Sequence, residues 1–183
     1  MATTAAANTF LQRLIGAMAL DTAIYEEVEA DRAATPQAFA VVLLSSLAAG
    51  VGARGLGGST PSNIVFVSIV ALLAWAAWAL LTLQIGGRLL PEPQTRVDVG
   101  ELLRTTGFAA APGLLRVFGI LPGVTIPAFA LTAVWMLAAM IVGVRQALDY
   151  TSTTRAIAVC ALGWALAIAF AVILGLIFGP TVN

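Results

Sequence analysis

Two groups of residues in this 183-residue chain have types and spacing that suit chemistry. The first is a run in which four of six consecutive positions are acidic: Glu26, Glu27, Glu29 and Asp31. The second is Arg116, which follows Pro112 and Gly113 in an otherwise apolar stretch. A carboxylate cluster can dock a partner protein, and a guanidinium in apolar surroundings can hold a phosphate or carboxylate. We therefore treat the carboxylates as a candidate docking surface and the second group as a candidate ligand or lipid contact.

The carboxylate run has two interpretations. It belongs to an expected helix, Thr22 to Ala30, that follows Asp21 as its N-cap. This helix either lies at the interface and covers the cytoplasmic end of a bundle, or presents its acidic face to a soluble partner. Four carboxylates repel anionic headgroups, so we expect the acidic face to point away from the membrane or onto protein.

Arg116 also has two interpretations. Pro112 and Gly113 either kink a membrane helix or break it, as helices are broken at transporter sites. Arg116 is close enough to Pro122 and Gly123 to snorkel to the far membrane surface. Alternatively, it is a functional charge within the membrane.

The chain lacks the side chains that most enzymes use for acid–base catalysis. It contains no His and no Lys, and its nine basic residues are all Arg. Ser45 and Ser46 have no His or Lys as a base, so we expect them to hydrogen-bond helical carbonyls. The single cysteine, Cys160, excludes a Cys-rich metal site, and the zero net charge disfavours nucleic acid as a partner. We predict a protein that is not an enzyme and needs no cofactor or metal.

The elements that position these residues are expected to be membrane helices. Hydrophobic residues make up 60% of the chain and charged residues 10%, with a mean hydropathy of +0.98. A soluble domain has about 25% charged residues and cannot bury so much apolar surface at this size. The sequence therefore predicts an all-α polytopic membrane helix bundle, with five transmembrane helices preceded by an amphipathic interfacial N-terminal helix.

Helix-start residues and apolar runs define these elements. Thr35 as N-cap and Pro36 as the first helical residue begin the first span, and Asp98 begins the helix of the third. The spans cover about residues 37–51, 62–85, 102–121, 125–144 and 155–178. The chain then divides into a cytoplasmic or interfacial region, 1–35, and a membrane domain, 36–179. With the N-terminus cytoplasmic and the C-terminus outside the inner membrane, seven arginines lie inside and two outside, as the positive-inside rule requires.

Small and aromatic residues mark the expected helix contacts. In the fifth span a small residue recurs at every fourth position: Gly163, Ala167, Ala171, Gly175 and Gly179. Such a stripe lets two helix backbones approach in a right-handed crossing, with a helix of the same chain or of another copy. Three tryptophans lie near the middle of spans, where they either pack against small residues or contact a pigment: Trp75, Trp78 and Trp135.

Three stretches resemble a known family: LDTAIYEEVE at 20–29, ELLRTTGFAAAPGLLR at 101–116, and the end of the Trp-containing fourth span, GVRQA at 143–147. They are similar to the prokaryotic branch of the Yip domain family, and the similarity extends over about residues 8–178. Members are five-span membrane proteins named for interaction with Ypt/Rab GTPases. The resemblance implies a five-span fold and no catalytic residues. In eukaryotic members the family's role is in vesicle trafficking and membrane shaping, and their GTPase binding depends largely on a longer N-terminal region.

We therefore expect a non-enzymatic integral membrane scaffold, or an accessory subunit of a membrane protein assembly, that helps to organise the membrane. Its expected partners are membrane lipids and either further copies of the chain or other membrane protein subunits. The alternative is a small-solute or lipid carrier that uses the broken third span.

Overall fold

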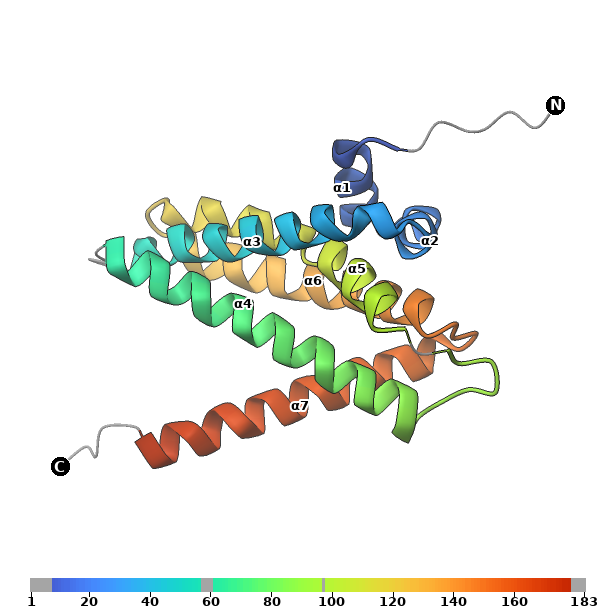
Figure 1. The fold of residues 1–183 in the computed structure, drawn as a ribbon. Helices are drawn as coiled ribbons and strands as arrows, with labels where there is room; N and C mark the ends of the chain where they lie inside the picture. The colour runs from blue at the N-terminus through green and yellow to red at the C-terminus, as the bar shows by residue number, and fades with distance from the viewer. Residues whose placement is uncertain (1–7, 57–60, 97, 179–183) are drawn as a thin grey trace.

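The computed structural model describes residues 8–56, 61–96 and 98–178, which are helical and contain no strand (Figure 1). The α-helices in these ranges are α1 (Phe10–Met18), α2 (Thr22–Ala30), α3 (Thr35–Gly52), α4 (Pro61–Gln84), α5 (Val99–Ala109), α6 (Thr125–Ala147) and α7 (Thr153–Phe178). Shorter segments are the 3₁₀-helices η1 (Arg32–Ala34), η2 (Ala53–Leu56) and η4 (Ala111–Ile120), and the π-helix η3 (Ile85–Leu89). The predicted all-α class is confirmed.

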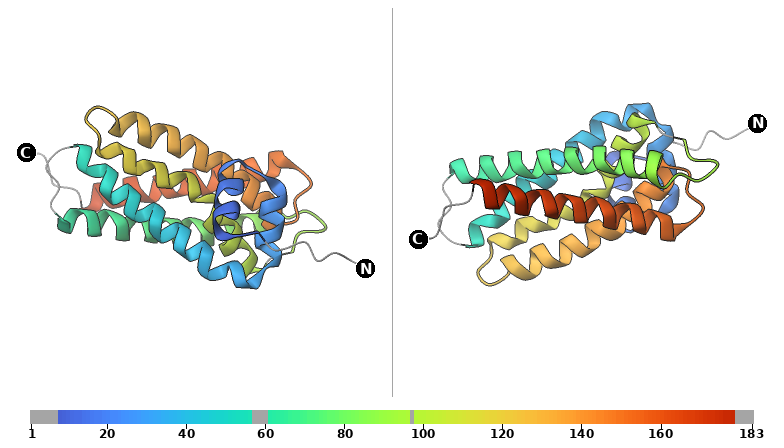
Figure 2. Two further views of the ribbon diagram at one scale, coloured as in Figure 1. Left: turned by 90° about the horizontal axis from the view of Figure 1, so that it is seen from above. Right: turned by 90° about the horizontal axis from the view of Figure 1, so that it is seen from below.

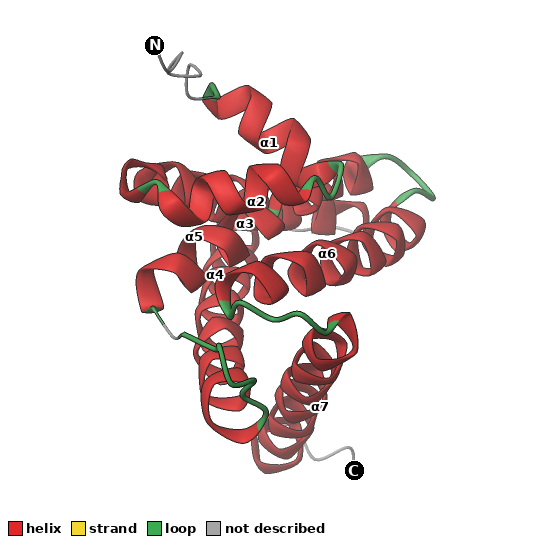
Figure 3. Cartoon of the chain, turned by 90° about the vertical axis from the view of Figure 1, so that its right-hand side faces the viewer, coloured by secondary structure: helices red, strands yellow, loops and turns green. Residues whose placement is uncertain are grey.

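The long helices α3, α4, α6 and α7 run between two ends of the molecule (Figures 1 and 2). One end carries α1, α2 and the connections that follow η3 and α6. We call this end, made of residues 8–34, 85–96 and 148–152, the charged end. Viewed toward it, α1 and α2 lie over α3, α5 and α6, while α4 and α7 lie on the opposite side (Figure 3).

Three helical stretches of the described residues are long and apolar enough to cross a membrane: Arg32–Gly55, Ile64–Leu89 and Thr125–Ala147. They coincide with the first, second and fourth predicted spans. Burial inside the chain covers 50% of the apolar window in the first stretch but only 18% in the second. The described part of α7 adds a shorter apolar helix, Thr153–Leu166. A total of five spans stays a prediction.

Pro112 and Gly113 leave a kink and a break open as alternatives, and the structure shows a break in the third predicted span. Helix α5 ends at Ala109, and the chain continues as the ten-residue 3₁₀-helix η4, with Pro112 near its start. Proline lacks an N–H and disfavours the α conformation in the residue before it, so an α-helix does not continue through it unchanged. The break allows η4 to take its own path along α3.

Glycines let η4 approach α3 closely. A Cβ on Gly52 would collide with the carbonyl oxygen of Arg116, and a Cβ on Gly55 would collide with that of Gly119. The backbone of η4 therefore rests directly on α3 and η2. This contact fixes where the Arg116 side chain begins.

The predicted helix starts are correct at two of three positions. Asp21 and Asp98 each accept a hydrogen bond of 3.0 Å from a backbone N–H two or three residues further on, as N-caps do. The prediction of Thr35 as an N-cap is wrong by one residue, because Thr35 is the first residue of α3 and Ala34 is its N-cap. The cause is η1, which Asp31 caps and which runs directly into α3.

Candidate functional site

Arg13 joins the first three helices at the charged end. Its side chain is almost fully buried, with the residue only 2% exposed. From α1, its Nη2 donates to Glu27 Oε1 at 2.8 Å and to Asp31 Oδ2 at 2.7 Å. Its Nη1 donates to Gln37 Oε1 of α3 at 3.1 Å. Two of the four predicted docking carboxylates thus already have a cation within the chain.

These contacts change the pKa of both carboxyl groups. Burial raises the pKa of Glu27, but hydrogen bonds from Asn8 and Arg13 outweigh burial and bring that pKa below its ordinary value. For Asp31, the hydrogen bond from Arg13 is the main cause of a lowered pKa, followed by one from the backbone N–H of Ala33. Both groups are therefore ionised at neutral pH and opposite a buried guanidinium.

The other two predicted docking residues have different surroundings. Glu26 is exposed and accepts a hydrogen bond of 2.9 Å from Gln146 Nε2 of α6. Glu29 is partly buried, and burial raises its pKa to about 7, helped by the negative charges of Glu101 and Asp149. Docking of a partner on the acidic residues stays a prediction. In the part of the chain that the structure describes, no three His, Cys, Asp or Glu side chains gather as metal ligands do.

Arg104 of α5 closes the C-terminus of α2. It is 5% exposed, and its Nε donates to the carbonyl oxygens of Val28 at 2.9 Å and Glu29 at 3.1 Å. A cation at this position neutralises the negative end of the helix dipole and satisfies carbonyls that have no partner within the helix. The charged end is thus held by buried arginines from two elements.

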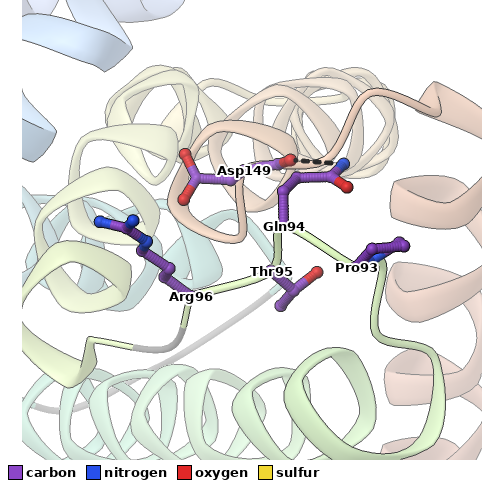
Figure 4. A pocket seen from close by; sticks show the side chains of 5 residues that line it. All are labelled: Pro93, Gln94, Thr95, Arg96 and Asp149. Carbon is purple, nitrogen blue, oxygen red and sulfur yellow. Dashed lines mark hydrogen bonds between the residues drawn. The ribbon is translucent and has the colours of Figure 1, made fainter.

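A polar crevice of about 590 Å³ lies between the connections at the charged end, lined by Pro93, Gln94, Thr95, Arg96 and Asp149 (Figure 4). Gln94 Nε2 crosses it and donates to the Asp149 carbonyl oxygen at 3.2 Å. The charged residues Arg96 and Asp149 are both exposed. This wide, solvated crevice does not hold a charged group in place for a ligand.

Glu92 and Tyr150 join the two connections beside the crevice. Glu92 accepts hydrogen bonds from Thr151 N at 3.0 Å and Thr151 Oγ1 at 2.8 Å, and pairs with Arg155 at 3.6 Å. The Tyr150 hydroxyl donates to carbonyl oxygens of η3 and its C-cap, Gly86 at 2.9 Å and Leu90 at 2.8 Å. The ion pair between Glu92 and Arg155 therefore joins the connection after η3 to the start of α7. The role of Tyr150 has no sequence signature and was not predicted.

A second pocket lies inside the bundle, between α4, α6 and α7. Its volume is about 380 Å³. Aromatic, Met and small apolar residues line it, with a single charged residue among them: Ala71, Ala74, Trp75, Trp78, Arg116, Ala133, Met136, Leu137, Met140 and Trp164. It has the size and mainly apolar lining that small-molecule sites have, about 300–1,000 Å³.

Arg116 reaches this pocket from η4. Its Nε donates to Thr132 Oγ1 at 3.3 Å, and its guanidinium carbon lies 5.4 Å from the centroid of the Phe129 ring. Both partners belong to α6, and the Arg116 side chain is partly buried. Among the described residues it forms no ion pair. The cation therefore lies against an aromatic ring and one hydroxyl, with no carboxylate.

Pro112 and Gly113 are buried behind Arg116 and do not line the pocket. A Cβ on Gly113 would collide with Ser45 Oγ and lie 3.0 Å from Met136 Sδ. The structure therefore brings one of the three predicted ligand-contact residues to a cavity and buries the other two, with Gly113 packed between α3 and α6.

The predicted tryptophans have three different environments. Trp75 Nε1 donates to the Thr106 carbonyl oxygen at 3.4 Å, and Trp135 Nε1 donates to that of Met18 at 2.8 Å. Trp78 is 7% exposed, and its Nε1 has no hydrogen-bond partner among the described residues. Trp75 and Trp78 line the pocket, whereas Trp135 joins α6 to the end of α1.

The small-residue stripe is described at one position. Gly163 is buried, and a Cβ there would lie 3.2 Å from Trp78 Nε1 of α4. The side chains of Ala167, Ala171 and Gly175 in α7, and residue Gly179 as a whole, lie outside the described part of the structure. Close packing along the stripe stays a prediction.

The apolar helices, the charged end and the internal pocket together define a helical integral membrane protein. Comparison with protein-family models gives a match to the Yip1 domain over residues 21–174, from the N-cap of α2 into α7, so the chain belongs to the Yip1 domain family. This family is associated with membrane trafficking and is not known for enzymatic activity. Comparisons with curated proteins and with solved structures give no match.

Proposed function

We propose that this Yip1 domain protein is a non-enzymatic scaffold or accessory subunit in the cytoplasmic membrane, which binds a second copy or another membrane protein. The supporting observation is the open face of α4, whose stretch is only 18% buried within the chain. Large apolar residues on it are more than half exposed: Phe66 at 67%, Leu73 at 62% and Leu80 at 57%. Lipid tails cover such a face no better than a second helix does, so van der Waals packing can favour a protein partner.

The proposed topology has five spans, with the N-terminus cytoplasmic and the C-terminus outside. At about 1.5 Å per α-helical residue and 2.0 Å per 3₁₀ residue, α5 and η4 together supply about 36 Å of helix, more than the hydrocarbon thickness of about 30 Å. Helix α7 has 26 residues, which is also sufficient. Reporter fusions at the two termini test this topology: opposite sides support it, and a single shared side overturns it.

The distribution of ionisable groups supports a role without catalysis. All nine Asp and Glu residues lie within 21–31, 92–101 and 149, at or beside the charged end, and the chain has no Lys or His. Proton transfer or water activation within the membrane needs groups of these types. The hydrogen bonds of the charged end instead join helices to one another.

Purification of the full chain in mild detergent and in lipid nanodiscs tests the scaffold proposal. Native mass spectrometry should detect a dimer, a larger assembly or a stoichiometric membrane partner. Replacing Phe66 and Leu73 by Ala should reduce the assembled fraction. The matched control replaces Ile126 and Val134 of α6, which are 73% and 70% exposed. A monomer under every condition contradicts the proposal. Equal dissociation in both double variants excludes the α4 face as the binding surface.

The second candidate function is a lipid carrier, and the position of Arg116 at a pocket favours it. A cavity lined in part by Ser45 of α3, Trp75 of α4 and Arg116 of η4 measures only about 40 Å³, so transport along this side of Arg116 would require the helices to separate. Vesicles containing the protein and fluorescently labelled phosphatidylglycerol measure transfer between leaflets. Faster transfer than in empty vesicles, slowed by Arg116→Ala, supports a carrier; transfer at the rate of empty vesicles excludes it.

A further inference from the structure

We propose that the pocket between α4, α6 and α7 binds an anionic membrane lipid, whose acyl chain fills the pocket and whose phosphate or carboxylate contacts Arg116. Helices α4 and α6 both belong to stretches that are long and apolar enough to cross a membrane, so the pocket lies at membrane depth. The inference rests on this membrane placement and is independent of the scaffold role.

The first argument is the unsatisfied charge of Arg116. A guanidinium has five N–H donors, and among the described residues only Thr132 Oγ1 accepts one of them, at 3.3 Å. The Phe129 ring, 5.4 Å away, contributes cation–π attraction but accepts no conventional hydrogen bond. A cation in apolar surroundings requires an anion or several acceptors. All Asp and Glu side chains lie in segments at or beside the charged end. The anion that pairs with Arg116 must therefore come from another source, such as a bound ligand.

The second argument is the shape and chemistry of the pocket. The pocket has a volume of about 380 Å³, and its wall contains one cation. The other wall groups are aromatic rings, thioethers and small aliphatic side chains. Met and Trp side chains adapt to flexible apolar ligands. The distribution of one charge and many apolar groups matches an amphiphile with one charged oxygen group and a hydrocarbon chain. It does not match a small polar solute.

The third argument is access. Arg116 is four residues before the end of η4, or about 8 Å at the 3₁₀ rise, and η4 ends at the side of the bundle away from the charged end. A lipid headgroup on this side can therefore reach the guanidinium. Trp164 on the pocket wall is 40% exposed, which leaves the pocket open toward the lipid around α7. Trp78, a second wall residue, carries an indole N–H that has no hydrogen-bond partner in the described part of the chain.

Tryptophan fluorescence offers a direct assay, because three of the four tryptophans line the pocket. Lipids with brominated acyl chains quench an indole on contact. The full chain in uncharged detergent is titrated with brominated phosphatidylglycerol and, separately, with brominated phosphatidylcholine. A charge-assisted hydrogen bond to Arg116 should make the anionic lipid quench at a mole fraction about tenfold lower.

Three variants separate charge from shape. Arg116→Gln should remove the tenfold preference and leave quenching by phosphatidylcholine unchanged. Arg54→Gln is the matched control, because Arg54 is exposed in η2 beside η4 and loses the same charge without lining the pocket. Ala133→Phe places a ring in the pocket and should weaken quenching by both lipids.

The proposal is overturned if wild type shows no preference between the two lipids, or if Arg116→Gln keeps the preference. It is also overturned if Arg54→Gln removes the preference as fully as Arg116→Gln. Displacement of the brominated lipid by millimolar inorganic phosphate would identify a free oxyanion, and not a lipid, as the ligand. If Arg116→Gln does not fold, Ala133→Phe still decides, because unchanged quenching in that variant places the lipid outside the pocket.

Discussion

Arg13 and Arg116 differ in the partners that surround their guanidinium groups. Arg13, at the charged end, is 2% exposed and faces two carboxylates within 2.8 Å. Arg116, in the apolar part, has one hydroxyl at 3.3 Å and an aromatic ring. The same side chain is thus neutralised within the chain at one end and left open to an external partner at the other.

Residue types alone suggest that the acidic run is the more evident binding site and that Arg116 is the less evident one, whereas the contacts of the two arginines suggest the opposite order. An acidic run at a helix surface is typical of a docking site, yet Arg13 is fully occupied in holding Glu27 and Asp31 to α1. A lone arginine beside a proline is typical of a kinked helix end. Here, however, the arginine lines a pocket. Among the described residues Arg116 has no carboxylate partner, and this observation motivates the lipid proposal. Docking of a partner on the acidic run stays a prediction.

The largest expected effect comes from removing Arg13. Arg13→Ala leaves two partly buried carboxylates without their cation and should lower the free energy of unfolding by about 2–3 kcal/mol. Arg116→Ala loses one hydrogen bond and a cation–π contact and should cost less than about 1 kcal/mol. Arg32→Ala, at an exposed arginine next to Asp31, is the control and should stay within about 0.5 kcal/mol.

Reversible unfolding by sodium dodecyl sulfate in mixed micelles, followed by circular dichroism, provides these free energies. Equal losses for Arg13→Ala and Arg116→Ala would break the comparison. That result would mean that Arg116 stabilises the fold as Arg13 does. Its unused N–H donors would then be no argument for a bound ligand.

A smaller effect is expected from two tryptophans that differ in hydrogen bonding. Trp135 Nε1 donates to the Met18 carbonyl oxygen at the charged end, whereas no described residue accepts a hydrogen bond from Trp78 Nε1 in the pocket. Trp135→Phe and Trp78→Phe remove the same side-chain volume, but among the described residues only Trp135→Phe also removes a hydrogen bond. Trp135→Phe should be more destabilising by about 1 kcal/mol. The opposite order would show that the Trp78 N–H makes a stabilising contact, for example with bound lipid, and delipidation should then abolish that order.

Local chemistry explains which parts of the fold are predictable from sequence. The helix starts at Asp21 and Asp98 depend on side chains and backbone within a few residues of each other, and both are confirmed. The same local chemistry predicts an interruption at Pro112 but does not decide between a kink and the break that the structure shows. Thr35 is misplaced because the turn before it, η1, was not predicted, and this turn moves the N-cap to Ala34.

The site residues are less predictable because their partners are distant in sequence. Glu27 and Asp31 lie 14 and 18 positions from Arg13, and Met18 lies 117 positions from Trp135. Hydrophobic periodicity places residues on helix faces but does not determine which faces meet. Arg116 was found because a charge in an apolar run is conspicuous. The pocket beside it depends on the packing of three helices and has no local pattern.

The smallest expected effect concerns pH and tests whether titration is confined to the charged end. Burial and the nearby charges of Glu101, Asp149 and Glu26 raise the pKa of Glu29 to about 7 in the folded chain, with Arg104 opposing. A raised carboxyl pKa means that the folded state binds more protons between about pH 4.5 and 7, so the unfolding free energy should fall as pH rises through this window. Solvent screening at this half-exposed site limits the change to less than about 1 kcal/mol.

Glu29→Gln should abolish the fall in stability between about pH 4.5 and 7 and leave the behaviour at lower pH intact. The lowered pKa values of Glu27 and Asp31 have the opposite sign: their stabilisation is present at neutral pH and is lost on acidification through the folded-state pKa values. Arg13→Ala should therefore reduce the loss of unfolding free energy at acidic pH (the acid limb). Glu29→Gln should abolish the decrease between about pH 4.5 and 7 (the neutral limb). Unfolding free energies at intervals from pH 3.5 to 8 distinguish the two. A neutral limb that persists in Glu29→Gln would contradict the assignment of this titration to Glu29.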